Sequence, residues 1–137
     1  MIAKAIATTP VPKREATGFA RKAEEFFGVM NVCVEDGEWN SVVLMGVHAC
    51  ISMCDAICVY KKGERSKSSN HHDAIHLLEQ ALPAHDDVGR NIRRLQEVIS
   101  KKHAVEYDPR NFSEKEARVF AEKIGRFFDW ARTHLVA

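Results

Sequence analysis

The chain has 137 residues, of which 45% are hydrophobic and 28% charged, and its formal net charge is +1. This length and apolar content favour one compact domain and argue against an intrinsically disordered chain. The small net charge predicts no global attraction to nucleic acid, and no segment has the roughly 20 consecutive apolar residues of a membrane-spanning helix. We expect a flexible tail over residues 1–12 and a single helical-bundle domain over residues 13–137. The first residues lack the apolar segment of a signal peptide, so a cytoplasmic location is expected.

Apolar residues recur at helical spacing through almost the whole chain, and no segment shows the sustained alternation of a half-buried strand. The first helix is expected from residue 12 or 15 to residue 34, with a stop signal at Asp36–Gly37. The second is expected from residue 39 or 40 to about residue 61, before Gly63. Its sequence is apolar on nearly every face, which is typical of the central helix of a bundle.

Three further helices complete the pattern. One begins at residue 69 or 70, where a serine or an asparagine side chain can cap the free amides, and ends at residues 82–83. The next runs from residue 86 to residue 103 or 107 and is ended by a proline. The last begins at Ser113, which forms a capping-box pattern with Glu116, and continues to the C-terminus. The sequence therefore predicts an all-α fold, an antiparallel bundle of about five helices joined by short connections.

The segment GERSKSSNHHDAI places Arg65 and His71 around a serine-rich turn between two expected helices. An arginine can hold a phosphate through two parallel hydrogen bonds, and a histidine titrates near neutral pH and can transfer a proton. Together these two side chains suffice for phosphodiester chemistry without a metal ion. The same residues fit equally a solvated turn followed by an ordinary helix N-terminus.

Four segments, taken in order, resemble the HEPN family of small bacterial helical domains. They are WNSVVLMGVHACISMCDAICVY, GERSKSSNHHDAIHLL, LQEVISKKHAVEYD and SEKEARVFAEKIGRFFDW. The resemblance extends from about Phe19 to Trp130 and implies a HEPN-like helical bundle. The family is associated with metal-independent endoribonucleases, often toxins paired with an antitoxin. Their signature is an arginine followed, after four to six residues, by a histidine.

In this chain the signature falls on Arg65 and His71, and His72 also lies within the spacing. The resemblance implies that His71 is a general acid or base acting on a ribose 2′-hydroxyl, and that Arg65 stabilises charge in the transition state. The helix N-terminus at His71 adds amide donors for an anion. Ser66 follows the arginine where nuclease members often have a larger polar residue. Two alternatives therefore stay open: a non-catalytic module that binds RNA, nucleotide or a partner nucleotidyltransferase, and a purely structural interaction domain.

A polar stripe lies within the most apolar expected helix. Its members are Ser41, His48, Ser52 and Asp55, which follow one another at helical steps. A buried carboxylate requires hydrogen-bonding partners. The stripe therefore fits an internal network or a dimer seam, and it fits equally a role for Asp55 in orienting His71 or Arg65.

Other polar residues are weaker candidates. Lys102 can contact a phosphate and Tyr107 can pack over the turn at the motif, although a solvated lysine and a tyrosine at the core edge fit the sequence equally. His72 and His76 are four residues apart and three cysteines share one helical face, but no set of four convergent ligands is apparent. The sequence predicts no bound metal and no cofactor.

We expect a homodimer, because one imidazole cannot easily serve as acid and base on opposite sides of a phosphate. A dimer would bring two Arg65/His71 pairs into one cleft. The polar stripe, the small residues around it, and the aromatic residues Phe127 and Trp130, expected to be exposed, offer apolar surface for this contact. The resemblance implies an antitoxin or a nucleotidyltransferase as partner, and no membrane partner is expected.

Overall fold

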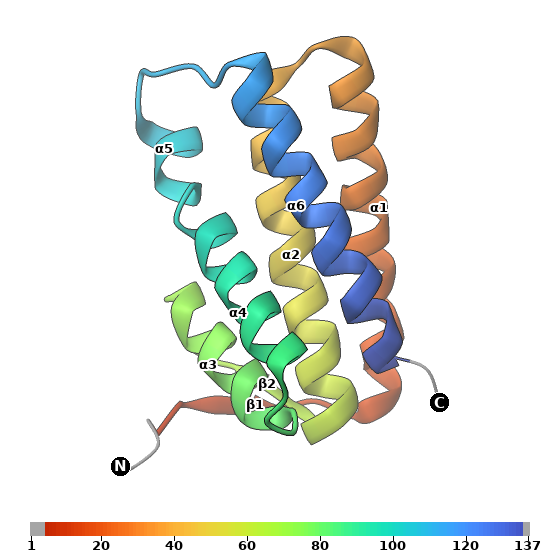
Figure 1. Cartoon of the computed structure of the whole chain (residues 1–137). Coiled ribbons are helices and arrows are strands. Elements are labelled where there is room, and N and C mark those ends of the chain that lie inside the picture. The colour runs from red at the N-terminus through yellow and green to blue at the C-terminus, as the bar shows by residue number, and fades with distance from the viewer. Residues whose placement is uncertain (1–4, 136–137) are drawn as a thin grey trace.

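The computed structural model describes residues 5–135, and it confirms the predicted all-α bundle (Figure 1). The α-helices of this part of the chain are α1 (Ala16–Asp36), α2 (Trp39–Lys62), α3 (His71–Ala81), α4 (Asp86–Ile99), α5 (Lys102–Tyr107) and α6 (Glu114–Arg132). The shorter elements are the strands β1 (Thr8–Pro10) and β2 (Glu64–Ser66) and the 3-10 turns η1 (Lys13–Glu15) and η2 (Thr133–Leu135).

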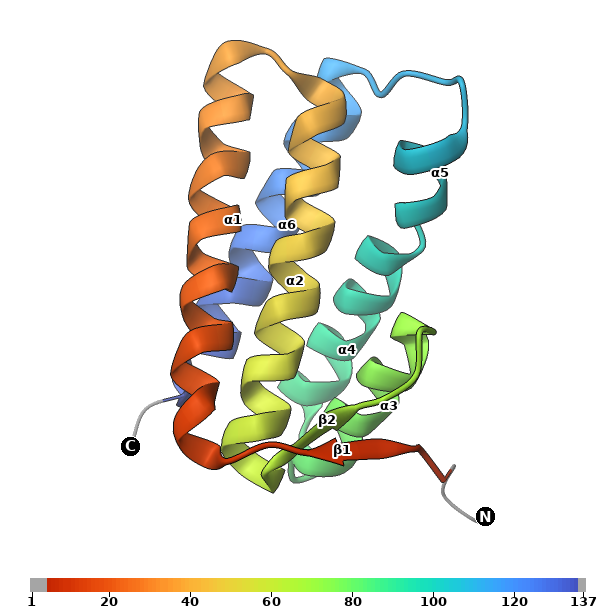
Figure 2. The ribbon, with the colours of Figure 1, turned by 180° about the vertical axis from the view of Figure 1, so that it is seen from behind.

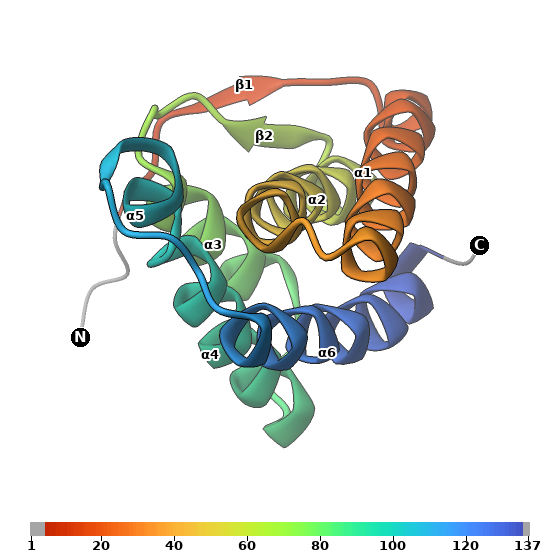
Figure 3. The ribbon, with the colours of Figure 1, turned by 90° about the horizontal axis from the view of Figure 1, so that it is seen from above.

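Helix α2 lies at the centre of the molecule (Figure 3). Viewed along the bundle, α1 and α6 pack on two of its sides, α3, α4 and α5 lie on a third, and the two strands cross the remaining side. The residues buried on α2 surround the helix instead of following one stripe. This arrangement explains why its sequence is apolar on nearly every face.

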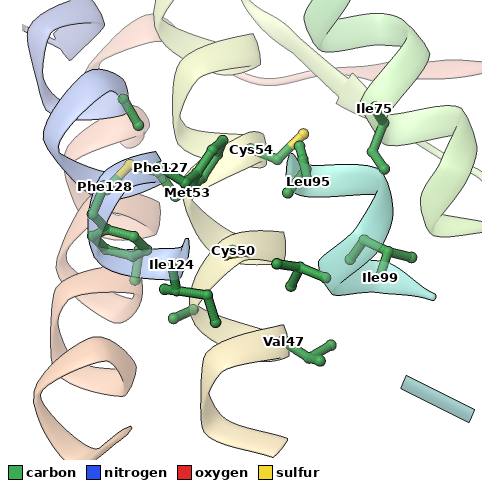
Figure 4. Packing of buried hydrophobic residues seen from close by; sticks show 14 of the residues in the cluster. Val47, Cys50, Met53, Cys54, Ile75, Leu95, Ile99, Ile124, Phe127 and Phe128 are labelled. Atoms are coloured by element: carbon green, nitrogen blue, oxygen red, sulfur yellow. The ribbon is translucent and has the colours of Figure 1, made fainter. Parts of the chain in front are cut away.

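The core forms where α2 meets α6 and α4 (Figure 4). Phe127 and Phe128 of α6, Leu95 of α4 and Met53 of α2 are fully buried in this one cluster. Truncating one such side chain to alanine typically costs about 2–5 kcal/mol. Gly46 permits the close approach of α6, because a Cβ atom there would collide with Ile124 and stand 2.8 Å from Phe120 Cε1.

By length and composition α2 is apolar enough to cross a membrane, although its sequence lacks an uninterrupted apolar run. In the structure 72% of its most apolar stretch is buried inside the bundle. The burial of this helix by its neighbours accounts for its composition.

Local signals set the helix ends as expected. Gly37 and Gly63 follow α1 and α2 with φ of 69° and 66°, a left-handed conformation that glycine adopts without strain. Asn70 caps α3 by accepting a hydrogen bond from the His72 amide at 3.0 Å. Ser113 and Glu116 form the predicted capping box at the start of α6.

One expected helix is two helices in the structure. The apolar periodicity continues from residue 86 to residue 107, but α4 ends at Ile99 and α5 begins at Lys102. The Ser100 hydroxyl donates a hydrogen bond to the Glu97 carbonyl at 2.6 Å, and the Lys101 amide bonds the Val98 carbonyl at 3.1 Å. A serine that bonds nearby backbone competes with the helical ladder, so the chain changes direction here without losing its apolar pattern.

Residues 8–10 differ from the flexible tail predicted for residues 1–12. They form β1, which pairs antiparallel with β2 so that Thr9 lies opposite Arg65. The Val11 amide bonds the Gly63 carbonyl at 2.8 Å, and the Thr8 hydroxyl donates to Glu64 Oε2 at 3.0 Å. Strands this short carry no alternation that a sequence pattern can reveal.

The aromatic residues near the end of α6 also differ from the prediction. Phe127 is fully buried, because it packs against Phe128 and Trp130 within the bundle. Trp130 is half-buried and stacks edge-on with His134. These rings belong to the core and its edge, so they offer little apolar surface to a partner.

Candidate functional site

The backbone of Arg65 is fixed by the small sheet. Gly63 ends α2 in a left-handed turn, and the chain then enters β2, where Arg65 is paired with Thr9 of β1. Figure 2 shows both strands crossing the end of α2 nearest Gly63 and running from there towards α3. The ladder therefore holds Arg65 beside the second half of α2.

The side chain of Arg65 is held by two neighbours. Its Nη2 atom donates a hydrogen bond to Oδ2 of Asp55 at 3.0 Å, and its guanidinium lies over the Phe19 ring at 5.0 Å. The Arg65 side chain is 43% exposed, whereas the Asp55 side chain is only 8% exposed. This hydrogen bond satisfies the buried carboxylate as an internal network would, and it also fits a role for Asp55 in orienting Arg65. The exposed part of the guanidinium faces solvent and is free to meet an anion.

Asp55 depends on this contact. Burial raises the pKa of its carboxyl group, and the charge and hydrogen bond of Arg65 oppose that rise. A buried carboxylate without a partner is strongly disfavoured, so Arg65 favours the ionised form of Asp55, and Asp55 in turn holds the arginine in place.

His71 is the first residue of α3 and is half-buried. It lies in a shallow depression of about 260 Å³ between the start of α3 and helix α5. The other residues that line the depression are Ser69, Asn70, His72, Ile99, Lys102, His103, Glu106 and Tyr107. The fold thus brings His71 together with three further sequence candidates, His72, Lys102 and Tyr107.

A charged network borders this depression. Lys102 Nζ lies 2.8 Å from Glu106 Oε1, and His48 Nε2 lies 3.7 Å from Glu106 Oε2. The hydrogen bond from Lys102 is the main reason that the pKa of Glu106 is lowered. Sequence reasoning missed Glu106, although its position four residues after Lys102 on a helix is a known ion-pair spacing.

The environment of His71 favours its neutral form. Burial lowers the pKa of His71, and the positive charges of Lys102 and His48 lower it further, while Glu106 opposes them. A neutral imidazole at neutral pH can accept a proton from a substrate. His71 therefore has the protonation state that a general base requires.

The turn between Arg65 and His71 is built from side-chain hydrogen bonds. The Ser66 hydroxyl accepts from the Ser68 amide at 3.3 Å, and the Ser68 hydroxyl accepts from the Asn70 amide at 3.0 Å. Ser66 thus shapes the connection. The His72 amide is occupied by the Asn70 side chain and the Asp73 amide by the Asn70 carbonyl, so these amides do not face an anion as the sequence suggested.

Arg65 and His71 have different surroundings. Arg65 contacts Asp55 and Phe19, and it does not line the depression that contains His71. Tyr107 is 71% exposed at the rim of that depression, with its ring centre 5.2 Å from that of His103, so it is not a core-edge residue.

The cysteines of α2 lie in the core. Burial raises the pKa of the Cys50 thiol, and Cys54 Sγ donates a hydrogen bond to the Ala74 carbonyl at 3.3 Å. Within residues 5–135, no group of three or more histidine, cysteine or acidic side chains is arranged to hold a metal ion. His72 and His76 do not form such a group.

Comparison with protein families identifies the family of the chain. A comparison with curated proteins finds no match to the sequence. The family model of the HEPN domain matches residues 16–134, which extend from the start of α1 to η2. Because this match covers nearly the whole chain, the protein belongs to the HEPN domain family.

Proposed function

We propose that this HEPN domain is a metal-independent endoribonuclease that cleaves RNA through attack by the ribose 2′-hydroxyl. The observation that carries the proposal is that half-buried His71 and Lys102 line one open depression, where burial and the charge of this lysine lower the pKa of His71. A base next to a fixed positive charge suits a reaction that removes a proton and builds negative charge on a phosphate.

In this reaction His71 takes the proton of the 2′-hydroxyl, and the 2′-oxygen attacks the adjacent phosphorus. Lys102 offers its positive charge to the non-bridging phosphate oxygens, and Arg65 offers the solvent-facing part of its guanidinium fork from the neighbouring strand. The products are a 2′,3′-cyclic phosphate on one fragment and a 5′-hydroxyl on the other.

The test is incubation of the purified protein with end-labelled tRNA and mRNA in EDTA. We expect cleavage without divalent metal and a cyclic phosphate on the 5′ fragment. His71→Ala should lower the rate about 100-fold or more, as removal of a general acid or base does. A wild-type protein that leaves RNA intact in EDTA and in magnesium alike would contradict the proposal.

A second candidate function is a non-catalytic module that binds RNA or nucleotide. The separation of Arg65, which is engaged by Asp55, from the His71 depression favours it. The same experiment separates the two functions, because a binding module retains labelled RNA and does not shorten it. A partner nucleotidyltransferase could then supply the chemistry.

We also propose a cytoplasmic homodimer that works with an antitoxin or a nucleotidyltransferase. Val29 and Val32 lie one turn apart on α1 and are 41% and 58% exposed, so they supply apolar surface for a second copy. The buried, unpaired cysteines of α2 suit a reducing compartment. Light scattering should return the mass of a dimer at micromolar concentration, and Val32→Glu should shift it towards the monomer. A monomer mass for the wild type would reject the homodimer.

A further inference from the structure

A second imidazole lies beside the His71 depression. His48 comes from the middle of α2, its side chain is 40% exposed, and its Nε2 atom lies 3.7 Å from Glu106 Oε2. Glu106 in turn lines the depression together with His71. One carboxylate of α5 therefore contacts a histidine of α2 and lines the same depression as a histidine of α3.

We propose that His48 and His71 of one protomer form an acid–base pair, in which His71 accepts the 2′-hydroxyl proton and His48 protonates the departing 5′-oxygen. This inference rests on the proposed ribonuclease function. It assigns a catalytic role to a residue outside the arginine–histidine motif.

The charged groups that surround His48 and His71 differ. A carboxylate oxygen of Glu106 lies 3.7 Å from Nε2 of His48. His71 is half-buried, and Lys102 on the same depression opposes a positive charge on it. Two titratable groups in contrasting environments are the usual arrangement for a separate acid and base.

His48 is surrounded by residues of three neighbouring helices, α1, α3 and α5. Phe26 of α1 meets the ring edge-on, with 6.5 Å between ring centres. The charged groups near it are Glu106 and Lys102 on α5 and His71 on α3. Among residues 5–135, Glu106 is thus the only acidic residue within 4 Å of His48, and its carboxylate also pairs with Lys102.

The chemical step balances with these two side chains. The 2′-oxygen gives its proton to neutral His71 and forms a bond to phosphorus. The bond from phosphorus to the 5′-oxygen breaks, and the 5′-oxygen takes a proton from His48. His71 ends protonated and His48 neutral, and proton exchange with water restores both. The pair supplies both proton transfers within one protomer, so a dimer is not needed for the chemistry.

The experiment compares two RNA oligonucleotides that differ at the cleavage site. One has the ordinary 5′-oxygen leaving group and the other a 5′-sulfur, which leaves as a thiolate without protonation because a thiol is far more acidic than an alcohol. His48→Gln should lower cleavage of the oxygen substrate about 100-fold or more and leave the sulfur substrate close to the wild-type rate. His71→Gln should lower cleavage of both, because the base is needed in either case.

Two further variants serve as a second test and as a control. Glu106→Gln should lower the cleavage rate of the oxygen substrate by a smaller factor than His48→Gln does, and it should leave the cleavage rate of the sulfur substrate close to that of the wild type. This variant tests the pair if His48→Gln fails to fold. His85→Asn is the matched control, because it removes an exposed imidazole at the other end of α4, and asparagine is itself a good helix cap. It should cleave both substrates at the wild-type rate.

Three outcomes would overturn the inference. If His48→Gln cleaves the oxygen substrate at the wild-type rate, or if its cleavage rate falls equally on both substrates, His48 is not the acid that protonates the leaving group. Recovery of activity on mixing His48→Gln with His71→Gln would place the pair across two subunits instead of within one. A wild type that cuts neither substrate removes the proposed function itself, and the acid–base pair with it.

Discussion

Arg65 donates a hydrogen bond from Nη2 to Oδ2 of Asp55 at 3.0 Å, and this contact joins strand β2 to the core helix α2. One partner is nearly buried and the other is partly exposed. Arg65 is therefore a structural residue as well as a candidate for phosphate contact. Any substitution of Arg65 must be judged on both properties.

Arg65→Ala should destabilise the fold because it leaves the Asp55 carboxylate buried without its partner. The expected loss in the free energy of unfolding is roughly 1–3 kcal/mol, the cost of an unsatisfied buried polar group. Adding Asp55→Asn should recover part of this loss, since a neutral amide is easier to bury than a charge. Urea unfolding of both single variants and the double variant measures the coupling. Strictly additive effects would mean that the contact carries no stability.

Arg65→Lys should separate the two properties of the arginine. A lysine ammonium can still pair with Asp55, so the urea midpoint should stay closer to the wild type than that of Arg65→Ala. Cleavage should nevertheless stay low, because a lysine retains the charge and loses the bidentate fork. Arg65→Ala should reduce turnover before it raises the apparent dissociation constant for RNA. A lysine variant with full activity would show that only the charge is used.

Lys102→Met and Glu106→Gln should move the pH dependence of cleavage in opposite directions. Lys102 lowers the pKa of His71 and Glu106 raises it. Removing the lysine should shift the acidic limb of the rate profile to higher pH, and removing the carboxylate should shift it to lower pH. NMR titration of the His71 ring checks the same directions without RNA. Shifts of the same sign would exclude direct charge effects on His71.

His71 should also make the stability of the fold depend on pH. Its folded pKa lies below the ordinary value of 6.5, so between these two values the unfolded chain binds more protons than the folded one. Stability from this residue is present above about pH 6.5 and is lost as pH falls through the folded pKa. Between pH 7.5 and pH 5 the wild type should lose more unfolding free energy than His71→Gln. Parallel curves would show that another group dominates.

Three helix boundaries were predictable because their signals are local, whereas the break between α4 and α5 was not. A left-handed Gly37 ends α1, a left-handed Gly63 ends α2, and the Ser113–Glu116 capping box begins α6. Each signal involves residues within one turn of the boundary, so a single sequence contains all the information needed.

The site was only partly predictable because its contacts are not local. Thr8 and Glu64, which join the two strands, are 56 residues apart, and no pattern at either position announces the pairing. Glu106 meets His48 from another helix, so its role appears only once α5 is packed beside α2. The proximity of Arg65 and His71 in sequence suggested one shared site, whereas the turn between them leads the two side chains to different partners.

The strand pairing leads to a final prediction for Thr9, which lies opposite Arg65 in the sheet. Thr9→Pro removes a backbone donor from a strand that is only three residues long, so β1 should separate from β2 while the helices stay intact. Thr9→Val is the matched control, because valine favours strands and retains the amide. In the proline variant, hydrogen exchange should speed up at Arg65 and at Lys67, whose amide bonds the Ala7 carbonyl, and cleavage should fall with little change in the helical circular dichroism signal. If cleavage is unchanged although exchange has accelerated, the sheet does not position Arg65 for the reaction, and Asp55 alone holds its side chain in place.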